Sequence, residues 1–323
     1  IPTRDRAELL LAALESLTRQ TLAAEAFEVL VIDNGSRDRT AEVAQAFASR
    51  LGNLRYLLAP EPGLHVGRHC GLQQARGDIL VFADDDIEAL PTWLAAIQQA
   101  FSDPGVAMVG GNNLPKFAEP PPPWLAGMWQ CANAQGLRAI PALSVVEFPG
   151  TRGEVSPYYI WGCNFAIRKE VLLAAGGFHP DGMPKDRIRF RGDGETHVSR
   201  HVAEAGLKSV FDASASVYHL VTPERMTFAY FRQRGFNQGV SDSYTDLRER
   251  HLHGRTFHAA KAALLRLARR AYRRLVGYGM PDADAEGALK EMDAGHAEGY
   301  AYHRRQFKTD REVRAWVLKE DYL

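Results

Sequence analysis

The sequence contains few cysteines and no excess of either charge. Only three cysteines occur in 323 residues, at Cys70, Cys131 and Cys163. Their wide separation fits neither a zinc ribbon nor a disulfide framework. Isolated thiols are typical of a reducing compartment, so we expect a cytoplasmic location. With 39 basic and 39 acidic residues the formal net charge is zero, which gives no reason to expect a nucleic-acid partner.

Long apolar runs and phosphate-binding loops are missing as well. No apolar stretch reaches the roughly 20 residues that span a bilayer, and no signal peptide is visible. The chain opens with IPTRDR and without an initiator methionine, so we expect residues upstream of Ile1. The sequence has no G-x-x-x-x-G-K-[ST] loop, which excludes a P-loop enzyme. No G-x-G-x-x-G follows the first apolar strand, which disfavours a dinucleotide site.

Short apolar runs alternate with helical spacing up to about residue 105. This alternation predicts an α/β fold with a mostly parallel central sheet flanked by helices. Ligands of such sheets bind at the carboxyl ends of the strands. The predicted strands are FEVLVID (27–33), LRYLLAP (54–60) and DILVFA (78–83), and helices are predicted over 4–20, 40–51 and 64–76.

The pattern changes after residue 105. EPPPPWL at 119–125 predicts a stiff surface loop, and KSVFDASASVYH at 208–219 predicts a strand. From Thr222 the chain becomes helical and basic. An amphipathic basic helix over 258–278 suits either an anionic membrane surface or packing on the domain or on another subunit. We therefore expect one domain over 1–222, with halves 1–105 and 106–222, and a helical extension over 223–323.

Acidic side chains stand where two predicted strands end. Asp33 follows VLVI, and three aspartates, Asp84 to Asp86, follow ILVFA. Adjacent carboxylates repel one another unless something cationic neutralises them. Asp84 and Asp86 form a D-x-D pair, which can hold Mg²⁺ or Mn²⁺ together with a diphosphate. Alternatively Asp86 caps a helix that starts after it, but a cap explains one aspartate and not three. A haloacid-type hydrolase also carries D-x-D, but its usual small hydroxyl residue is replaced here by Glu88.

Five segments, taken in chain order, stand out over roughly residues 1–222. They are IPTRDRAELLLAALESLTRQT, FEVLVIDNGSRDRT, GLHVGRHCGLQQARGDILVFADDD, WGCNFAIRKEVLLAAGGF and RGDGETHVSRHVAEAG. Together these segments resemble the family 2 glycosyltransferases of GT-A fold.

The resemblance implies transfer of a sugar, with inversion, from a UDP-, GDP- or dTDP-sugar to a hydroxyl of a glycan or lipid-linked acceptor. Carried over position by position, it implies a donor site at Pro2, Thr3, Asp33, Arg68, Asp84 and Asp85, and an Mn²⁺ or Mg²⁺ site at Asp84, Asp86 and His219. An ordinary strand-end histidine is an equally good interpretation of His219.

The general base expected from the resemblance lies in RGDGETHVSRHVAEAG. The family places its base ten residues before an Ala-Gly pair, here Ala205-Gly206, and this spacing selects Glu195. The family has Asp at this position, preceded by Glu, so Asp193 is the rival. A helix-start acid and a helix cap are the structural alternatives for the two residues. His197 lies on the following helix, but H-E-x-x-H is absent and zinc is disfavoured.

Acceptor contacts are expected at Trp161, Asn164 and Arg232. Aromatic faces suit sugar rings but suit a protein core equally well, and a single arginine on a helix is usually solvated. Two other functions stay open. A nucleotidyltransferase acting on sugar phosphates would need a Gly-rich loop near the first strand, which IPTRDRAE does not resemble. A non-catalytic, membrane-docked scaffold would not bind nucleotide with metal.

Overall fold

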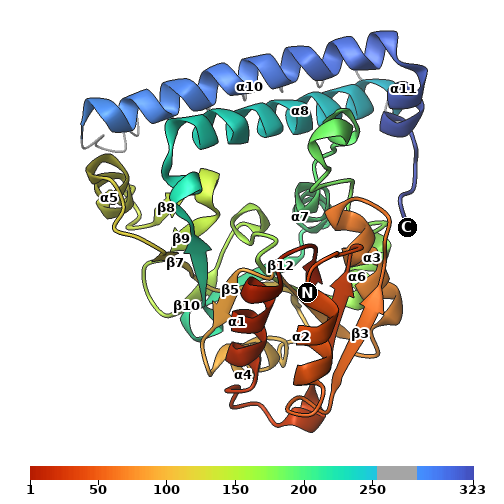
Figure 1. Ribbon diagram of the computed structural model, residues 1–323, viewed down its shortest axis with the longest axis vertical. Helices are drawn as coiled ribbons and strands as arrows, with labels where there is room; N and C mark the ends of the chain where they lie inside the picture. Colours follow the sequence, from red (N-terminus) through yellow and green to blue (C-terminus); the bar gives the residue numbers. More distant parts are fainter. Residues whose placement is uncertain (253–281) are drawn as a thin grey trace.

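The computed structural model describes residues 1–252 and 282–323 of the chain (Figure 1). The basic helix predicted over 258–278 lies outside these residues, so its role stays a prediction. Within the described ranges no helix is long and apolar enough to cross a bilayer.

Strands and helices alternate through the first part of the chain, as predicted. The first three strands pair side by side and parallel, in the order β1-β2-β3. Helix α2 ends a few residues earlier than its apolar spacing predicts. The elements are β1 (Pro2–Thr3), α1 (Ala7–Leu17), β2 (Val29–Asp33), α2 (Thr40–Phe47), β3 (Leu54–Leu58), α3 (Leu64–Gln74) and β4 (Ile79–Ala83).

Two five-stranded sheets follow, with the orders β10-β12-β6-β11-β4 and β5-β13-β7-β9-β8. The α/β class is confirmed, but these two sheets are mixed rather than mostly parallel. In the first, β11 runs antiparallel to both β4 and β6, and in the second, β5 runs antiparallel to β13. Parallel pairing is kept between β6 and β12 and between β7 and β13. Their strands are β5 (Ile87–Ala89), β6 (Val106–Gly110), β7 (Asn113–Phe117), β8 (Arg138–Ile140), β9 (Val145–Glu147), β10 (Arg152–Glu154), β11 (Asn164–Arg168), β12 (Lys208–Asp212) and β13 (Val217–Val221).

The single strand predicted over 208–219 is wrong, because the segment forms β12 and β13 in different sheets. A short turn separates them, and the Asp212 carboxylate accepts a hydrogen bond from the Ser214 backbone at 2.8 Å within it. The break moves the chain beside β5, where His219 stands opposite Ile87. It therefore brings His219 next to the residue that follows Asp86.

Two predicted local features take a different form. Asp86 does not cap a helix, because β5 intervenes and Thr92 occupies the N-cap position of α4 (Trp93–Ala100). The proline run does not stay a loop, because α5 (Pro123–Gln130) starts inside it with a proline in its first turn, a position where the missing N–H costs nothing. Trp124 is buried there against Phe228 and Phe231.

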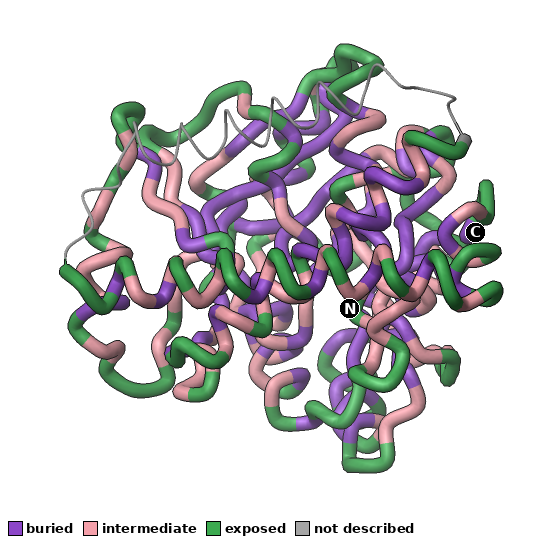
Figure 2. Tube along the Cα trace, turned by 90° about the horizontal axis from the view of Figure 1, so that it is seen from above, coloured by how far each residue is buried: buried purple, intermediate pink, exposed green. Residues whose placement is uncertain are grey.

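Two long helices cross one end of the molecule side by side (Figure 1). They are α8 (Phe228–Leu252) and α10 (Ala283–Thr309), and the short α11 (Arg311–Val317) follows. Seen from that end, the outer helix, α10, is largely exposed, while buried segments lie in the sheets beneath it (Figure 2). Four glycines allow the α8 and α10 backbones to touch. A Cβ placed on any of them would lie 2.0–2.1 Å from a carbonyl oxygen of the other helix; they are Gly235, Gly239, Gly295 and Gly299.

Residues 318–323 return to the sheet domain after α11. The Trp316 indole N–H donates to the Phe190 carbonyl at 2.7 Å, and the Tyr244 and Tyr322 hydroxyls lie 2.9 Å apart. Tyr244 is fully buried on α8. The last turns of the chain thus pack against both α8 and the loop that leads into the predicted base, a contact that the ending EVRAWVLKEDYL did not indicate.

Buried imidazoles make the stability of this fold depend on pH. Burial lowers the pKa of His65, His197 and His303 from 6.5 to about 4. At these three side chains the unfolded chain therefore binds more protons than the folded one between about pH 4 and 6.5, and their contribution to the free energy of unfolding falls as the pH is lowered through that window. Urea unfolding at pH 7.5 and pH 5 should show a lower midpoint at pH 5. Replacing fully buried His303 by Gln should make the change smaller, and equal midpoints at both pH values would contradict the expectation.

Candidate functional site

Asp84, Asp86 and His219 form a compact group of potential metal ligands. One ligand atom from each lies within 4.8 Å of the others. The His219 Nε2 is 3.3 Å from the Asp86 Oδ1. Asp86 Oδ1 and His219 Nδ1 are buried without a hydrogen-bond partner among the described residues. Two carboxylates, one imidazole and unsatisfied buried atoms together fit a divalent cation such as Mn²⁺, which accepts oxygen and nitrogen ligands.

Arginines already neutralise part of the acidic cluster. The Arg6 Nη1 lies 2.6 Å from Asp85 Oδ1, and its Nη2 lies 2.8 Å from Asp86 Oδ2. The Arg225 Nη1 lies 3.5 Å from Asp86 Oδ2. Sequence reasoning missed both arginines, because their only signals are a position just after Thr3 and a position six residues after His219. A metal bound here would therefore be one of several positive charges that this cluster faces.

The carboxylates of the cluster differ in their electrostatics. Burial raises the pKa of Asp84, against the opposing charge of Arg68. Burial raises the pKa of Asp85 to about 7, although Arg6 and a hydrogen bond from Thr3 oppose the rise. Burial acts in the same direction on Asp86, but His219 and Arg6 outweigh it and hold its pKa well below the usual range. Asp86 is therefore the member of the cluster most firmly held as a carboxylate.

A cavity of about 260 Å³ opens beside these acids. Four of the six residues predicted to bind the donor line it, namely Pro2, Thr3, Asp84 and Asp85. The Thr3 hydroxyl donates to the buried Asp85 Oδ2 at 2.7 Å, which joins β1 to the acidic turn. The remaining lining residues are Arg4, Arg6, Asn34, Gly63, Leu64, Gly182 and Pro184.

Asp33 directly precedes Asn34, which lines this cavity, but Asp33 itself does not line it. Both of its oxygens are engaged: Oδ1 accepts from the Ser36 backbone at 2.7 Å, and Oδ2 accepts from the Tyr56 hydroxyl at 2.6 Å. Only 2% of Asp33 is exposed. Its neighbour Asn34, which the sequence did not single out, faces the cavity instead.

Arg68 links the acidic cluster to the predicted base. Its side chain is 3% exposed, with Nη2 3.7 Å from Asp84 Oδ1 and Nη1 3.4 Å from Glu195 Oε2. The Gly162 backbone N–H donates to Glu195 Oε1 at 3.4 Å. A Cβ at Gly162 would lie 2.2 Å from the Arg68 Nη2, so a side chain at this position would displace the guanidinium. One buried guanidinium thus touches both acids, from residues far apart in the sequence.

Glu195 is the first residue of α7 (Glu195–Glu204), where the sequence predicted a helix start. The preceding Gly194 has φ 53°, a conformation that favours glycine. The Glu195 side chain is 26% exposed. It is therefore oriented by Arg68 and Gly162 and still open to solvent.

Asp193 has a different environment, with its side chain only 4% exposed. Its Oδ1 lies 2.6 Å from the His179 Nδ1. Its Oδ2 accepts from the Thr245 hydroxyl at 2.7 Å and from Arg200 at 3.1 Å. Burial works to raise its pKa, but His179 and Arg200 outweigh burial and hold the pKa well below the usual range. Asp193 therefore ties the loop before α7 to α8, and it does not cap α7, whose N-cap is Gly194.

The His197 side chain packs against its neighbours. Its ring stacks on His179 with centroids 3.6 Å apart, and its Nε2 lies 2.7 Å from the Ala175 carbonyl. This contact agrees with the packing role that the sequence favoured over zinc.

The three residues predicted on the acceptor side do not lie in one place. Asn164 is 1% exposed, and its amide bonds the Trp93 indole and the Ala215 carbonyl, both at 2.9 Å. Arg232 pairs with Glu291 at 2.7 Å and with a second glutamate, both on α10. Asn164 and Arg232 are thus engaged by neighbouring groups of the protein, and their acceptor role stays a prediction. Trp161 is partly buried, and its indole donates to the Tyr158 carbonyl at 3.0 Å.

Comparison with known proteins places this arrangement in a family. Residues 1–172 match the model of glycosyl transferase family 2. A glycosyltransferase, AglE, from Haloferax volcanii is 39% identical over 113 residues, which are 35% of this chain and 37% of AglE. A glucosyl-dolichyl phosphate glucuronosyltransferase from the same organism is 23% identical over 259 residues, 75% of this chain and 74% of that protein.

Among solved structures, the mannosyltransferase PcManGT from Pyrobaculum calidifontis, in complex with GDP-Man and Mn²⁺, superposes with a TM-score of 0.50. The match covers 98% of this chain and 81% of that one at 18% identity, and it shows a shared fold. The expected GT-A fold is thereby confirmed. The family model covers more than half of the described chain, including the acidic cluster at the end of β4. The chain belongs to glycosyl transferase family 2.

Proposed function

We propose that this protein is an inverting, metal-assisted glycosyltransferase that moves a sugar from a nucleotide-diphosphate sugar to an acceptor hydroxyl. The observation that carries the proposal is the shared contact of Arg68 with Asp84 and Glu195. The Arg68 guanidinium lies between Asp84 of the D-x-D pair and the carboxylate of Glu195, which is accessible to solvent. An inverting transfer needs such an arrangement, with a leaving-group site on one side and a base on the other.

The donor half of the site is built from the small cavity and the acidic cluster. The nucleotide would occupy the cavity lined by Pro2, Thr3 and Asp84. Asp84, Asp86 and His219 would hold Mn²⁺ or Mg²⁺, which when bound stabilises negative charge on the departing diphosphate. The use of a nucleotide sugar with Mn²⁺ by a protein of the same fold supports this assignment.

Arg6 and Arg225 extend the donor half with positive charge. Both guanidiniums lie at Asp86, within 2.8 Å and 3.5 Å of its Oδ2. Cationic side chains fixed where charge develops lower the barrier without reorganising during the reaction. We therefore propose that Arg6 and Arg225 contact the phosphates of the donor.

The acceptor half centres on Glu195. Its carboxylate would take the proton from the acceptor hydroxyl while the oxygen attacks the anomeric carbon and the bond to the diphosphate breaks. The proton ends on Glu195, and the electron pair of the broken bond ends on the nucleoside diphosphate. Arg68 and the Gly162 N–H orient the carboxylate. Asp193 supports the loop and takes no part in the proton transfer.

The acceptor is proposed to be a glycan or a lipid-linked sugar. A relative that aligns along three quarters of this chain is named for a glucosyl-dolichyl phosphate substrate, which supports the lipid-linked alternative. Nothing in the motifs encodes the sugar itself, because sugar choice depends on the shape of the pocket.

A donor screen tests the proposal. UDP-, GDP- and dTDP-sugars are added with Mn²⁺ or Mg²⁺, and melting temperature and release of nucleoside diphosphate are followed. We expect at least one donor to raise the melting temperature and to be hydrolysed slowly only when metal is present. No response to any of the nucleotide sugars would contradict the proposal that this protein is a glycosyltransferase.

Variants of the ligand group test the metal assignment. Asp86→Asn and His219→Ala should each raise the Mn²⁺ concentration needed for half-maximal donor turnover by at least about tenfold, since each removes one of three protein ligands. Asp103→Asn is the control, because Asp103 is an exposed carboxylate that pairs with Lys208 outside the cluster. An unchanged Mn²⁺ dependence in both ligand variants would remove His219 and Asp86 from the metal site.

A further inference from the structure

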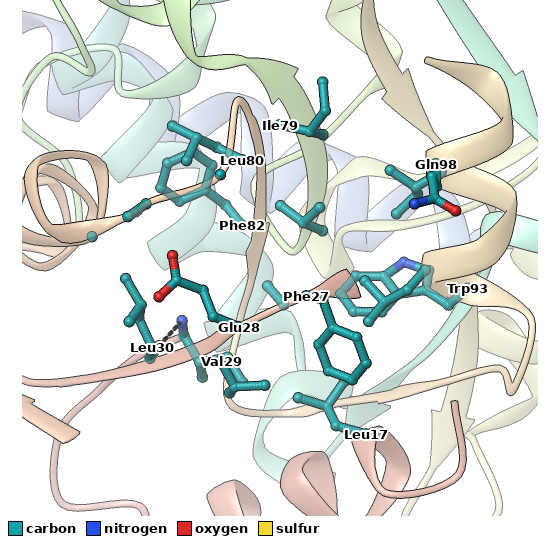
Figure 3. Close-up of a pocket in the computed structure, with 18 of the residues that line it drawn as sticks. Leu17, Phe27, Glu28, Val29, Leu30, Ile79, Leu80, Phe82, Trp93 and Gln98 are labelled. Carbon is teal, nitrogen blue, oxygen red and sulfur yellow. Dashed lines mark hydrogen bonds between the residues drawn. The ribbon is translucent and has the colours of Figure 1, made fainter. Parts of the chain in front are cut away.

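Two cavities share Pro2 as a lining residue but differ in the other groups that line them. The larger one, of about 650 Å³, is bordered by Leu30 of β2 and Phe82 of β4 and is lined mainly by apolar side chains (Figure 3). The smaller one, of about 260 Å³, lies beside the acidic cluster and is lined by Arg4 and Arg6. A phosphate group binds best to guanidinium groups that point at it, so the smaller cavity is the one suited to a diphosphate.

The backbone turns sharply at Asp5, between the end of β1 at Thr3 and the start of α1 at Ala7. Asp5 has φ 52°, in the left-handed region that few residues other than glycine, asparagine and aspartate adopt. Among the non-glycine residues that the structure describes, only Ser144 shares a positive φ. Strained backbone of this kind persists where surrounding contacts hold it, and it clusters at functional sites.

The loop that follows β2 holds this turn in place. The Asp5 backbone N–H donates to the Ser36 Oγ at 2.9 Å, and the Arg37 backbone N–H donates to the Asp5 Oδ1 at 2.7 Å. At the first residue of α1, the Ala7 N–H donates to the Asp38 Oδ2 at 2.9 Å. Three hydrogen bonds to one loop thus fix the chain at Asp5 and just after it, so the left-handed conformation is set by tertiary contacts.

Arg4 and Arg6 flank the turn, and both line the smaller cavity. Arg6 is already paired, with Nη1 2.6 Å from Asp85 and Nη2 2.8 Å from Asp86. Among the described residues the only carboxylate that pairs with Arg4 is that of Asp5, 3.8 Å from Nε, and both of these side chains are 47% exposed. Because exposed ion pairs contribute little, the Arg4 guanidinium is available to a ligand in the cavity.

We propose that the left-handed turn at Asp5 positions Arg4 and Arg6 for the phosphates of a nucleotide-diphosphate donor. Any other backbone conformation at Asp5 would redirect the chain between the two arginines and move one guanidinium away from the cavity. A guanidinium that is already held in place loses less freedom when the ligand binds, which strengthens binding. Asp5 is then a positioning residue that acts through its two neighbours, and the inference rests on the proposed function.

Three substitutions at Asp5 test the proposal. Asp5→Asn tolerates a positive φ and keeps an acceptor oxygen, Asp5→Gly keeps only the turn, and Asp5→Val opposes the turn because β-branched residues avoid this region. UDP, GDP and dTDP are each titrated into the folded proteins with Mn²⁺, and the dissociation constant and the melting temperature are measured. We expect Asp5→Val to raise the dissociation constant by about tenfold or more, and the other two variants to stay within about threefold of the unsubstituted chain.

Asp103→Val is the control, because Asp103 is also an exposed aspartate that accepts a backbone hydrogen bond in a turn, but it lines neither cavity. Its dissociation constant should not change. If Asp5→Val lowers only the melting temperature and binds nucleotide as before, the turn serves stability and the proposal is overturned. Equal losses of affinity in Asp5→Val and Asp5→Gly would assign the effect to the carboxylate and overturn the role of the turn. An unsubstituted chain that binds none of the three nucleotides would instead contradict the proposed function, and this inference with it.

Discussion

Glu195→Gln is expected to lower kcat for sugar transfer by about a hundred- to ten-thousandfold, the range that a lost general base accounts for. Gln keeps the shape of the side chain and its contact distance to Arg68, so donor binding should change little. Transfer rates measured at saturating donor, together with a binding isotherm for the nucleotide sugar, check both parts. Glu204→Gln is the matched control, because Glu204 is an exposed glutamate on the same helix.

Asp193→Asn is expected to act on stability instead. It removes a buried charge that lies against His179 and pairs with Arg200, and breaking such a pair costs about 3–5 kcal/mol. The melting temperature should drop clearly, while the protein that stays folded should keep part of its activity. A stable but inactive Asp193→Asn protein, combined with an active Glu195→Gln protein, would exchange the roles assigned to the two acids.

Gly295→Ala is expected to destabilise the protein by about 1–3 kcal/mol or more, because it overpacks the contact between α10 and α8. The new Cβ would lie 2.0 Å from the Arg232 carbonyl oxygen, which belongs to the α8 backbone and cannot rotate away. The two helices must therefore move apart along their length. Denaturant unfolding measures the loss.

Gly287→Ala on the same helix is the control for that change. A Cβ at Gly287 would meet only the Phe228 ring, at an ordinary 3.4 Å. Since alanine favours helices over glycine by about 0.5–1 kcal/mol, this variant should be neutral or slightly more stable. If both variants behave alike, the backbone contact between α8 and α10 is not what fixes their packing.

The sequence was a good guide to the first part of the chain. Apolar spacing there is regular, and β2, β3 and β4 lie where short apolar runs predicted them. It failed at 208–219, because nothing in the apolar pattern marks the turn where the chain leaves one sheet for another. The predicted division at residue 222 stays a prediction.

The acids assigned to the site stay predictions, and the sequence did not single out the arginines that lie beside them. A strand that ends in three aspartates is a local signal, and so is the start of α7 at Glu195. Arg6 and Arg225 carried no such signal, because an arginine near a turn is usually solvated. The acceptor role of Asn164 and Arg232 stays a prediction, and both side chains bond neighbouring groups of the protein.

The sequence by itself determined the α/β alternation, the acidic strand end and the helix that begins at Glu195, because each depends on neighbours within a few residues. The tertiary structure alone decided which charges meet: Arg6 reaches Asp86 across 80 positions of sequence, and Arg68 reaches Glu195 across 127. Such contacts depend on how sheets and helices pack, and apolar periodicity carries no information about partners at that separation. The physical link between the proposed donor site and the proposed base is therefore a property of the fold.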